Sequence, residues 1–247
     1  MDQPVLIKVG GHQINDKEFL AELADIIKGF PAPVIVVHGG GREISDMQKL
    51  MGIEPRYVNG LRFTDEPSLK MVEMVLCGVV NKRLVRYLLN AGVDALGMSG
   101  VDRGLVRGRK IADDMGFTGE VTQVRGDILL DLLLQGTTPV ISPVCLGEDS
   151  NLNVNADHVA GAVAAAVGAS QIVFLTNVEG VLVGEERAPR LAQDHASALI
   201  DDGTIFGGMI PKVRTALSVL DSGVPQAAIT NLTGLRTHGG TVFVRKV

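Results

Sequence analysis

The sequence predicts an α/β protein, a three-layer αβα sandwich in which helices cover both faces of a mainly parallel central sheet. The first reason is that short runs rich in Val and Ile are continuous, as strands buried on both faces require. The second is that segments with helical periodicity separate these runs, which indicates right-handed crossovers. The third is size, because 247 residues with 46% hydrophobic content can bury a large core.

The expected elements alternate along the chain. Strands are expected at residues 5–11, 34–40, 94–100, 138–144, 171–177, 226–230 and 241–247. Helices are expected at residues 16–28, 42–51, 67–91, 127–135, 156–167 and 212–222. Two Gly-punctuated segments, 54–69 and 104–124, are predicted to form hairpins over one edge of the sheet. Because no Pro/Ser-rich linker occurs, we expect two lobes on a shared core, residues 1–169 and 170–247.

Composition and charge exclude several functional classes. The net charge of −5 and pI near 5.5 disfavour nucleic-acid binding, which needs a basic face. No run of roughly 18 apolar residues occurs, and the N-terminus lacks a signal peptide, so we expect a cytoplasmic protein with no membrane association. Cys77 and Cys145 fit no metal-ligand spacing, and no metal site is predicted in the chain.

Glycines follow two of the predicted strands. In "VIVVHGGGREISD", residues 34–46, Ile44 replaces the third glycine of a dinucleotide fingerprint and Arg42 lies inside the turn, which argues against NAD binding. In "IKVGG", Lys8 precedes a second pair of glycines. Two neighbouring turns of this kind can offer backbone N–H groups and an ammonium to one anion. The alternative is two ordinary turns with a surface lysine.

Two further segments carry polar residues whose position suggests a ligand. In "NLNVNADHVAG", residues 151–161, Asn155 is a natural N-cap and Asp157 suits the first helical turn, but capping does not explain Asn153. In "FGGMIPKV", residues 206–213, Lys212 lies in the first helical turn, where a cation opposes the helix dipole. An anion bound nearby would remove that conflict.

Together with "VNGLRFTD", "ALGMSG", "GFTGEV", "PVISPV" and "FLTNVEGV", these stretches resemble the amino-acid kinase family, in the family's order and over almost the whole chain. The resemblance implies the amino-acid kinase fold and ATP-dependent phosphorylation of a carboxylate to an acyl phosphate. It also implies Mg²⁺ held mainly by the ATP phosphates. The N-terminal lobe would bind the acyl substrate and dimerise, and the C-terminal lobe would bind ATP.

The same resemblance assigns roles to individual positions. Lys8 and Lys212 would stabilise the transferring phosphoryl group, and Asp157 would hold both lysines in place. The acyl substrate and phosphates would be held by Gly10, Gly11, Gly39, Gly40, Gly41, Arg62, Asn153 and Asn155. The nucleotide would be lined by Thr176, Asn177, Gly180, Val181, Gly207, Gly208 and Met209.

The residue types agree with this chemistry independently of the family. A substrate carboxylate is already ionised at neutral pH, so the nucleophile needs no general base. Lysines, glycine N–H groups and Mg²⁺ suffice to bring two anions together, and Arg62 can hold a second carboxylate by a two-pronged contact. His12 and His38, beside the glycine turns, are therefore expected to be structural.

The identity of the substrate remains open between two branches of the family. One branch phosphorylates the γ-carboxylate of N-acetyl-L-glutamate in arginine biosynthesis, and the other acts on carrier-linked aminoadipate in lysine biosynthesis. The motifs around Asn153 and Lys212 favour the first. Asn177, where acetylglutamate-specific members usually carry Asp, and a basic patch (Arg103, Arg107, Arg109 and Lys110) suited to an acidic carrier protein favour the second. A non-catalytic sensor of the same fold is a third possibility.

An oligomeric state is also implied by the resemblance. Arginine-inhibited members carry an additional N-terminal helix that links dimers into hexamers, whereas the first strand here is expected to start near Pro4. We therefore expect an arginine-insensitive homodimer.

Overall fold

The computed structural model describes residues 2–11 and 13–246. Its centre is an eight-stranded sheet with the order β14-β16-β15-β11-β1-β2-β8-β5. Its strands are β1 (Val5–Val9), β2 (Val34–His38), β5 (Ala95–Ser99), β8 (Thr138–Ser142), β11 (Gln171–Leu175), β14 (Arg190–Ala192), β15 (Gln226–Thr230) and β16 (Thr241–Val244). All neighbours pair in parallel except β15 and β16. The predicted fold class is confirmed.

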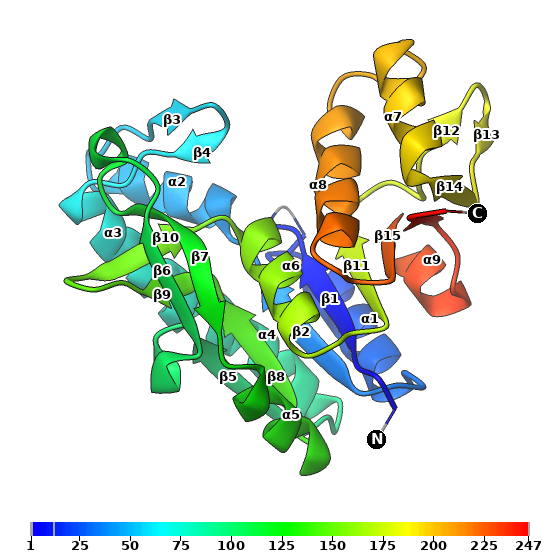
Figure 1. The fold of residues 1–247 in the computed structure, drawn as a ribbon. Coiled ribbons are helices and arrows are strands. Elements are labelled where there is room, and N and C mark those ends of the chain that lie inside the picture. The colour runs from blue at the N-terminus through cyan, green and yellow to red at the C-terminus, as the bar shows by residue number, and fades with distance from the viewer. Residues whose placement is uncertain (1, 12, 247) are drawn as a thin grey trace.

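A second β unit lies beside this sheet (Figure 1). It is a small closed barrel of four strands: β6 (Val106–Lys110), β7 (Thr118–Val124), β9 (Val144–Leu146) and β10 (Asn151–Val154). The hairpin predicted within residues 104–124 is present as β6 and β7, but it belongs to this barrel and not to an edge of the main sheet. The run 138–144 was predicted to be one strand and is two, because Pro143 between them has no N–H group to pair.

Short hairpins complete the β structure. The hairpin predicted at residues 54–69 is present as β3 (Tyr57–Val58) and β4 (Leu61–Arg62), but these strands form a two-stranded sheet of their own and do not pair with the edge of the main sheet. The sequence did not indicate β12 (Leu182–Val183) and β13 (Glu186–Arg187), which form another two-stranded hairpin.

The helices lie close to their expected positions. They are α1 (Lys17–Lys28), α2 (Gly41–Leu50), α3 (Glu66–Glu73), α4 (Asn81–Asn90), α5 (Gly126–Leu134), α6 (Ala156–Ala166), α7 (Gln193–Asp201), α8 (Met209–Asp221) and α9 (Leu232–Thr237). The helix expected at 67–91 consists of α3 and α4 joined by a π-helix, η1 (Met74–Val80), and α7 and α9 were not predicted. Single 3₁₀ turns occur at η2 (Asp102–Gly104) and η3 (Asp113–Met115).

Every strand of the sheet except β14 contributes to two hydrophobic cores. Successive side chains point to opposite faces, so Leu6 packs in a core with residues of α6 and α8, whereas Ile7 packs in one with residues of α1. Figure 1 shows α6 in front of β1 and α1 behind it. Lys8 has the parity of Leu6 and therefore lies on the side of α6.

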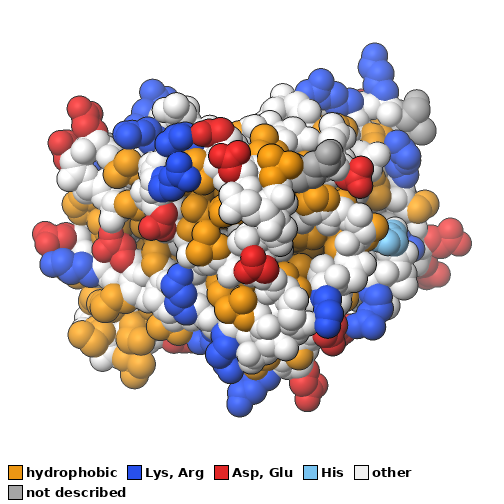
Figure 2. Space-filling model, turned by 90° about the horizontal axis from the view of Figure 1, so that it is seen from below, with side chains coloured by type: hydrophobic (Ala, Val, Ile, Leu, Met, Phe, Trp, Pro, Cys, Tyr) orange, Lys and Arg blue, Asp and Glu red, His pale blue; other side chains and the backbone are white. Residues whose placement is uncertain are grey.

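The outer surface carries both signs of charge. Figure 2 shows Lys, Arg, Asp and Glu side chains interspersed, with hydrophobic side chains gathered at one end of this face. In the part of the chain that the structure describes, no helix combines the length and apolar character needed to cross a membrane.

Candidate active site

Two glycine turns lie side by side at the carboxyl ends of β1 and β2. These strands are hydrogen-bonded neighbours with Val9 opposite His38, and the Gly39 N–H donates to the carbonyl oxygen of Val9 at 3.0 Å. A Cβ atom on Gly11 would lie only 3.0 Å from the Gly40 nitrogen and 3.1 Å from the Gly41 nitrogen. Only glycine at position 11 allows the two turns to approach this closely.

The predicted lysine and aspartate of the site are joined by an ion pair. Lys8 Nζ lies 2.7 Å from Asp157 Oδ1, with the two side chains 16% and 29% exposed. Asp157 is in the first turn of α6, and its N–H donates to the Asn155 side-chain oxygen at 2.8 Å. The predicted capping role of Asn155 is thereby confirmed, and the cap fixes the helix end from which Asp157 reaches Lys8.

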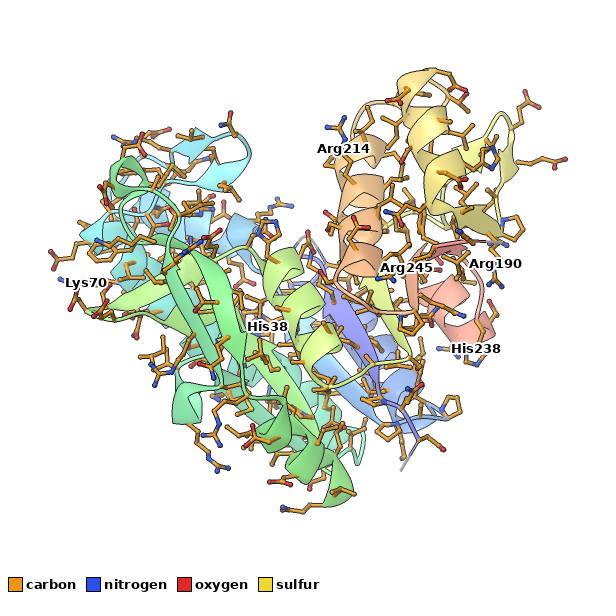
Figure 3. The ribbon with its side chains drawn as sticks, in the orientation of Figure 1. His38, Lys70, Arg190, Arg214, His238 and Arg245 are labelled. Carbon is orange, nitrogen blue, oxygen red and sulfur yellow. The ribbon has the colours of Figure 1, made fainter. Side chains whose placement is uncertain are left out.

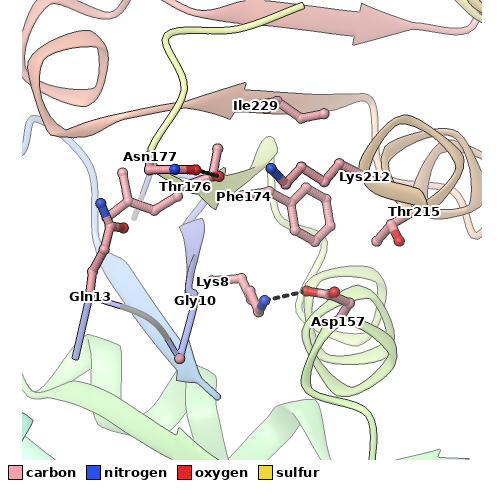
Figure 4. Close-up of a pocket in the computed structure, with 12 residues that line it drawn as sticks. Lys8, Gly10, Gln13, Asp157, Phe174, Thr176, Asn177, Lys212, Thr215 and Ile229 are labelled. Atoms are coloured by element: carbon pink, nitrogen blue, oxygen red, sulfur yellow. Dashed lines mark hydrogen bonds and ion pairs between the residues drawn. The ribbon is translucent and has the colours of Figure 1, made fainter. Parts of the chain in front are cut away.

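Lys8 and Asp157 line a cavity of about 430 Å³ that also receives Lys212. Lys212 extends from α8 on the opposite side of this cavity (Figure 4). The remaining lining residues are Gly10, Gly11, Gln13, Phe174, Leu175, Thr176, Asn177, Thr215 and Ile229. The structure therefore brings both lysines to one cavity. Among the described residues, Asp157 forms an ion pair with Lys8 and none with Lys212.

The predicted nucleotide residues divide into two groups. Thr176 and Asn177 line the cavity, and the Thr176 hydroxyl donates to the Asn177 side-chain oxygen at 3.2 Å. Val181 is fully buried and its N–H donates to the Thr241 hydroxyl at 2.8 Å. Gly180, Gly207, Gly208 and Met209 also lie outside the lining of the cavity. Their contact with a nucleotide stays a prediction.

A second cavity, of about 170 Å³, is lined by the glycine turn of β2. It groups six residues that the sequence indicated as binding the acyl substrate: Gly39, Gly40, Gly41, Arg62, Asn153 and Asn155. The segments that supply them are far apart in the chain, and the fold brings them together.

Arg62 is the main cation of this second cavity. It is only 8% exposed, and it donates to the Gly41 carbonyl at 2.7 Å, to the Ser45 hydroxyl at 2.9 Å and to the Tyr57 hydroxyl at 2.5 Å. It also donates to the Gln48 side-chain oxygen. Burial lowers the pKa of Arg62. No carboxylate of the described residues pairs with it, so a positive charge is held here by neutral acceptors.

The side-chain amide of Asn153 is tied to the same region. Its Nδ2 donates to the Thr64 hydroxyl at 2.9 Å, and the Thr118 hydroxyl donates to the Arg62 carbonyl at 2.6 Å. The barrel strands β7 and β10 therefore fix the hairpin strand that carries Arg62.

Several lining residues were not predicted from the sequence. Ile229 adds an apolar side chain to the wall of the first cavity, and Tyr57 and Thr118 line the second. Ile229 was part of a predicted strand, but which face it occupies depends on the helix that covers that face. Phe174, in contrast, begins the segment 174–181 that the family resemblance had placed along the nucleotide, and it lines the first cavity. The only sequence feature that could have indicated Tyr57 is its position after an Arg within a predicted hairpin.

None of the cysteines or of the histidines that the structure describes lines either cavity. His38 is fully buried, and burial lowers its pKa to about 4, while His12 lies outside the described residues. Cys145 is buried and Cys77 partly so, and both are free thiols. Among the described residues, no three His, Cys, Asp or Glu side chains come together as metal ligands.

Comparison with known proteins gives the family. Residues 3–231 match the amino acid kinase family. The chain belongs to that family. An acetylglutamate kinase of Roseiflexus sp. (strain RS-1) is 53% identical over 249 residues, which span 99% of this chain and 95% of the relative.

Further relatives agree with this assignment. An acetylglutamate kinase of Chloroflexus aurantiacus (strain ATCC 29366 / DSM 635 / J-10-fl) is 47% identical over 243 residues, 96% of this chain and 95% of the relative. Among solved structures, smu.665 from Streptococcus mutans UA159 superimposes with a TM-score of 0.83 at 28% identity, over 100% of both chains. The resemblance that the motifs carried is confirmed.

Proposed function

We propose that this chain transfers the γ-phosphoryl group of ATP to the γ-carboxylate of N-acetyl-L-glutamate, as a step of arginine biosynthesis. One observation carries the proposal: the cavity with Lys8, Asp157 and Lys212 meets the cavity with Arg62 across two adjoining glycine turns. A phosphoryl donor in the first and a carboxylate acceptor in the second would face each other at the glycines.

The reaction needs positioning and charge neutralisation. A carboxylate oxygen forms a bond to the γ-phosphorus, the bond from that phosphorus to the bridging oxygen breaks, and ADP leaves with the electron pair. The acceptor is ionised at neutral pH, so no side chain has to remove a proton. Lys8 and Lys212 would stabilise the negative charge on the transferring group from two sides, and the glycine N–H groups would add hydrogen bonds.

Asp157 would orient Lys8 within this arrangement. Its carboxylate lies 2.7 Å from Nζ and restricts the position of the ammonium. Because both side chains are mostly shielded from water, the pair is screened less than a surface ion pair.

Arg62 would bind the α-carboxylate of the acyl substrate. The guanidinium already lacks a carboxylate partner among the described residues, so a substrate carboxylate would supply the missing negative charge. Asn153 and Asn155, on the same cavity wall, can both donate to and accept from an acetamido group.

Mg²⁺ is part of the proposal as an ion held mainly by the ATP phosphates. The described residues contain no cluster of three potential metal ligands, and Asp157 is engaged by Lys8. An ion bound in this way would neutralise charge between the β- and γ-phosphates. We place the reaction in the cytoplasm, where ATP is supplied.

The relatives favour N-acetylglutamate over carrier-linked aminoadipate, because the similar chains are acetylglutamate kinases over almost their full length. The basic side chains that suggested an acidic carrier are also partly used within the chain. Arg109 pairs with Glu120 at 2.7 Å, and Lys110 lies over the Phe117 ring at 5.0 Å.

We also propose a homodimer formed through the free edge of β5. This strand ends the eight-stranded sheet, and no strand of the described residues pairs with its outer side. Leu96 on β5, Val79 on η1 and Leu89 on α4 are exposed apolar side chains. A second copy could extend the sheet and cover them. Light scattering should give twice the chain mass, and Leu96→Asp should reduce it toward that of one chain.

A hydroxamate assay tests the reaction itself. Hydroxylamine traps an acyl phosphate, so MgATP with N-acetyl-L-glutamate should give product, and carrier-linked aminoadipate should give far less. The reverse preference would assign the chain to the lysine branch. ATP binding without product from either substrate would favour the non-catalytic sensor.

A further inference from the structure

His38 connects the glycine turn of β2 to the interior of the protein. It is the last residue of β2, is fully buried, and lies inside the molecule in Figure 3. Its Nδ1 lies 2.9 Å from the Gly39 carbonyl oxygen, and its Nε2 lies 3.1 Å from Asn81 Nδ2. Because a carbonyl oxygen can only accept, Nδ1 carries the proton, and the unprotonated Nε2 accepts from Asn81.

Asn81 is itself held in one orientation. Its Nδ2 donates to the Val140 carbonyl at 2.9 Å, and its Oδ1 accepts from Lys82 Nζ at 3.1 Å. The side chain is fully buried, and a Cβ on Gly97 would lie 2.1 Å from Oδ1. Contacts with strands β5 and β8 thus hold the Asn81 amide in the orientation in which it donates to the ring of His38.

The hydrogen bond from His38 to the Gly39 carbonyl determines the direction of the Gly40 N–H. In a trans peptide the Gly39 carbonyl and the Gly40 N–H belong to one planar unit and point in opposite directions. Since the carbonyl points toward His38, the Gly40 N–H points away from it, and the Gly40 nitrogen borders Gly11. Among the described residues, no hydrogen-bond acceptor is recorded for the N–H groups of Gly40 and Gly41.

Packing supports the same conformation from the other side. A Cβ on Gly40 would lie 2.6 Å from a methyl group of Leu76 and 3.3 Å from one of Val80, both on η1. The turn is therefore confined by η1 on one side and by the His38 hydrogen bond on the other, which leaves the N–H groups as its free polar face.

We propose that His38, held by Asn81, is a positioning residue that aims the Gly40 N–H at the transferring phosphoryl group. This inference rests on the proposed kinase function, because it assigns the N–H a role in that transfer. It goes beyond a packing role for His38, since it requires the Nδ1–H in particular.

Two substitutions separate the hydrogen bonds of His38. The amide of Asn can superpose on Cγ and Nδ1 of histidine, so His38→Asn can keep the donor to Gly39. The amide of Gln reaches the position of Nε2, so His38→Gln can keep the contact with Asn81 and lose the donor to Gly39. Both variants are polar and smaller than or similar to histidine, so their effects on folding should be comparable.

The test measures hydroxamate formation from N-acetyl-L-glutamate and MgATP, with ADP-binding stoichiometry to count folded sites. We expect His38→Asn to retain kcat within about threefold and His38→Gln to lose at least tenfold in kcat, with the KM of both substrates within about threefold. Equal kcat values per folded site in the two variants would overturn the inference. Absence of product from the unsubstituted chain would instead refute the proposed function.

Discussion

The ammonium of Lys8, on the central strand β1, lies 2.7 Å from the carboxylate of Asp157, in the first turn of α6. The pair crosses the junction between the sheet and the helix that covers its front face (Figure 1). Lys8 is thereby directed toward the cavity that Lys212 enters from α8. The relationship links the packing of α6 to the position of a charge that the proposed reaction would use.

Replacing Asp157 by Asn should lower kcat by about 10-fold to 100-fold with little change in KM, because Lys8 loses its orienting carboxylate. In the double variant with Lys8→Ala, the loss of kcat should be far smaller than the sum of the two single losses in free energy, since both changes disrupt the same ion pair. Steady-state kinetics on the two single variants and the double variant measure this. Asp127→Asn, in the first turn of α5 and paired with exposed Arg125, is the control and should keep full activity.

Replacing Lys212 by Ala should lower kcat far more than it raises the KM of the acyl substrate, because we propose that its charge acts on the transferring phosphoryl group. The same split is expected for Lys8→Ala. The measurement is kcat and KM from the hydroxamate assay at saturating MgATP. Arg214→Ala removes an exposed cation from the same helix and should change neither constant. An effect of Lys212→Ala on KM alone would mean that its role is binding.

Replacing Arg62 by Lys should raise the KM for N-acetylglutamate by about 10-fold or more and leave the affinity for ADP unchanged. An ammonium cannot reproduce the planar, multiple contacts of a guanidinium with a carboxylate. Kinetics for the acyl substrate and calorimetry with ADP measure the two effects. Arg56→Lys offers a matched control, because Arg56 stacks on Phe63 at 3.8 Å and lines neither cavity. A weaker affinity for ADP in Arg62→Lys would contradict the assignment.

Most of the sheet could be predicted from the sequence, because strands buried on both faces need continuous apolar runs and these runs are visible without the fold. The barrel could not. Its strand β9 continues the run of β8 after Pro143, and β10 is only four residues long. Helix α9 is shorter still than the expected helices and has few apolar positions to show a period.

The candidate site was partly visible for a similar reason. Lys8 and the glycines stand out locally, since a lysine within an apolar strand and glycines after it conflict with ordinary packing. The neutral acceptors around Arg62 did not stand out: Gln48 and Tyr57 come from separate segments, and only the fold places both against the guanidinium. His38 was expected to be structural, and nothing in the sequence indicated its bond to Asn81, which joins residues 43 positions apart.

The stability of the protein should fall as the pH is lowered from about 6.5 toward 4 because of His38. Burial, with a smaller contribution from Lys82, lowers its pKa from 6.5 to about 4. Between these values the unfolded chain binds a proton that the folded chain does not, so unfolding becomes easier as the pH falls. Above pH 6.5 this group contributes no pH dependence. The full effect approaches about 3 kcal/mol, and urea unfolding at several pH values measures it.

The control for this prediction is His38→Asn, which has no titrating ring. Between pH 4 and 6.5, the unfolding free energy of this variant should depend less on pH than that of the unsubstituted chain. The remaining dependence should be the part due to carboxylates. An identical pH dependence in both chains would show that His38 is not the group responsible.

Replacing Gly11 by Ala should abolish most of the activity without unfolding the protein. The added Cβ would lie 3.0 Å from the Gly40 nitrogen and 3.2 Å from its Cα, which is backbone that cannot rotate away. The two glycine turns would have to separate by a few tenths of an ångström, and the N–H groups would lose their common aim at one phosphoryl group. A displacement of this size is enough to lower kcat by about 10-fold or more.

Gly29→Ala gives the matched comparison, because its Cβ would meet only ordinary contacts at 3.8 and 3.9 Å. Its kcat should equal that of the unsubstituted chain, and both variants should keep their melting temperatures within a few degrees. If Gly11→Ala retained full kcat, the close approach of the turns would have no part in catalysis. Loss of kcat together with retained binding of ADP would locate the damage at the turns, since Phe174, Thr176 and Asn177 on the nucleotide side would be untouched.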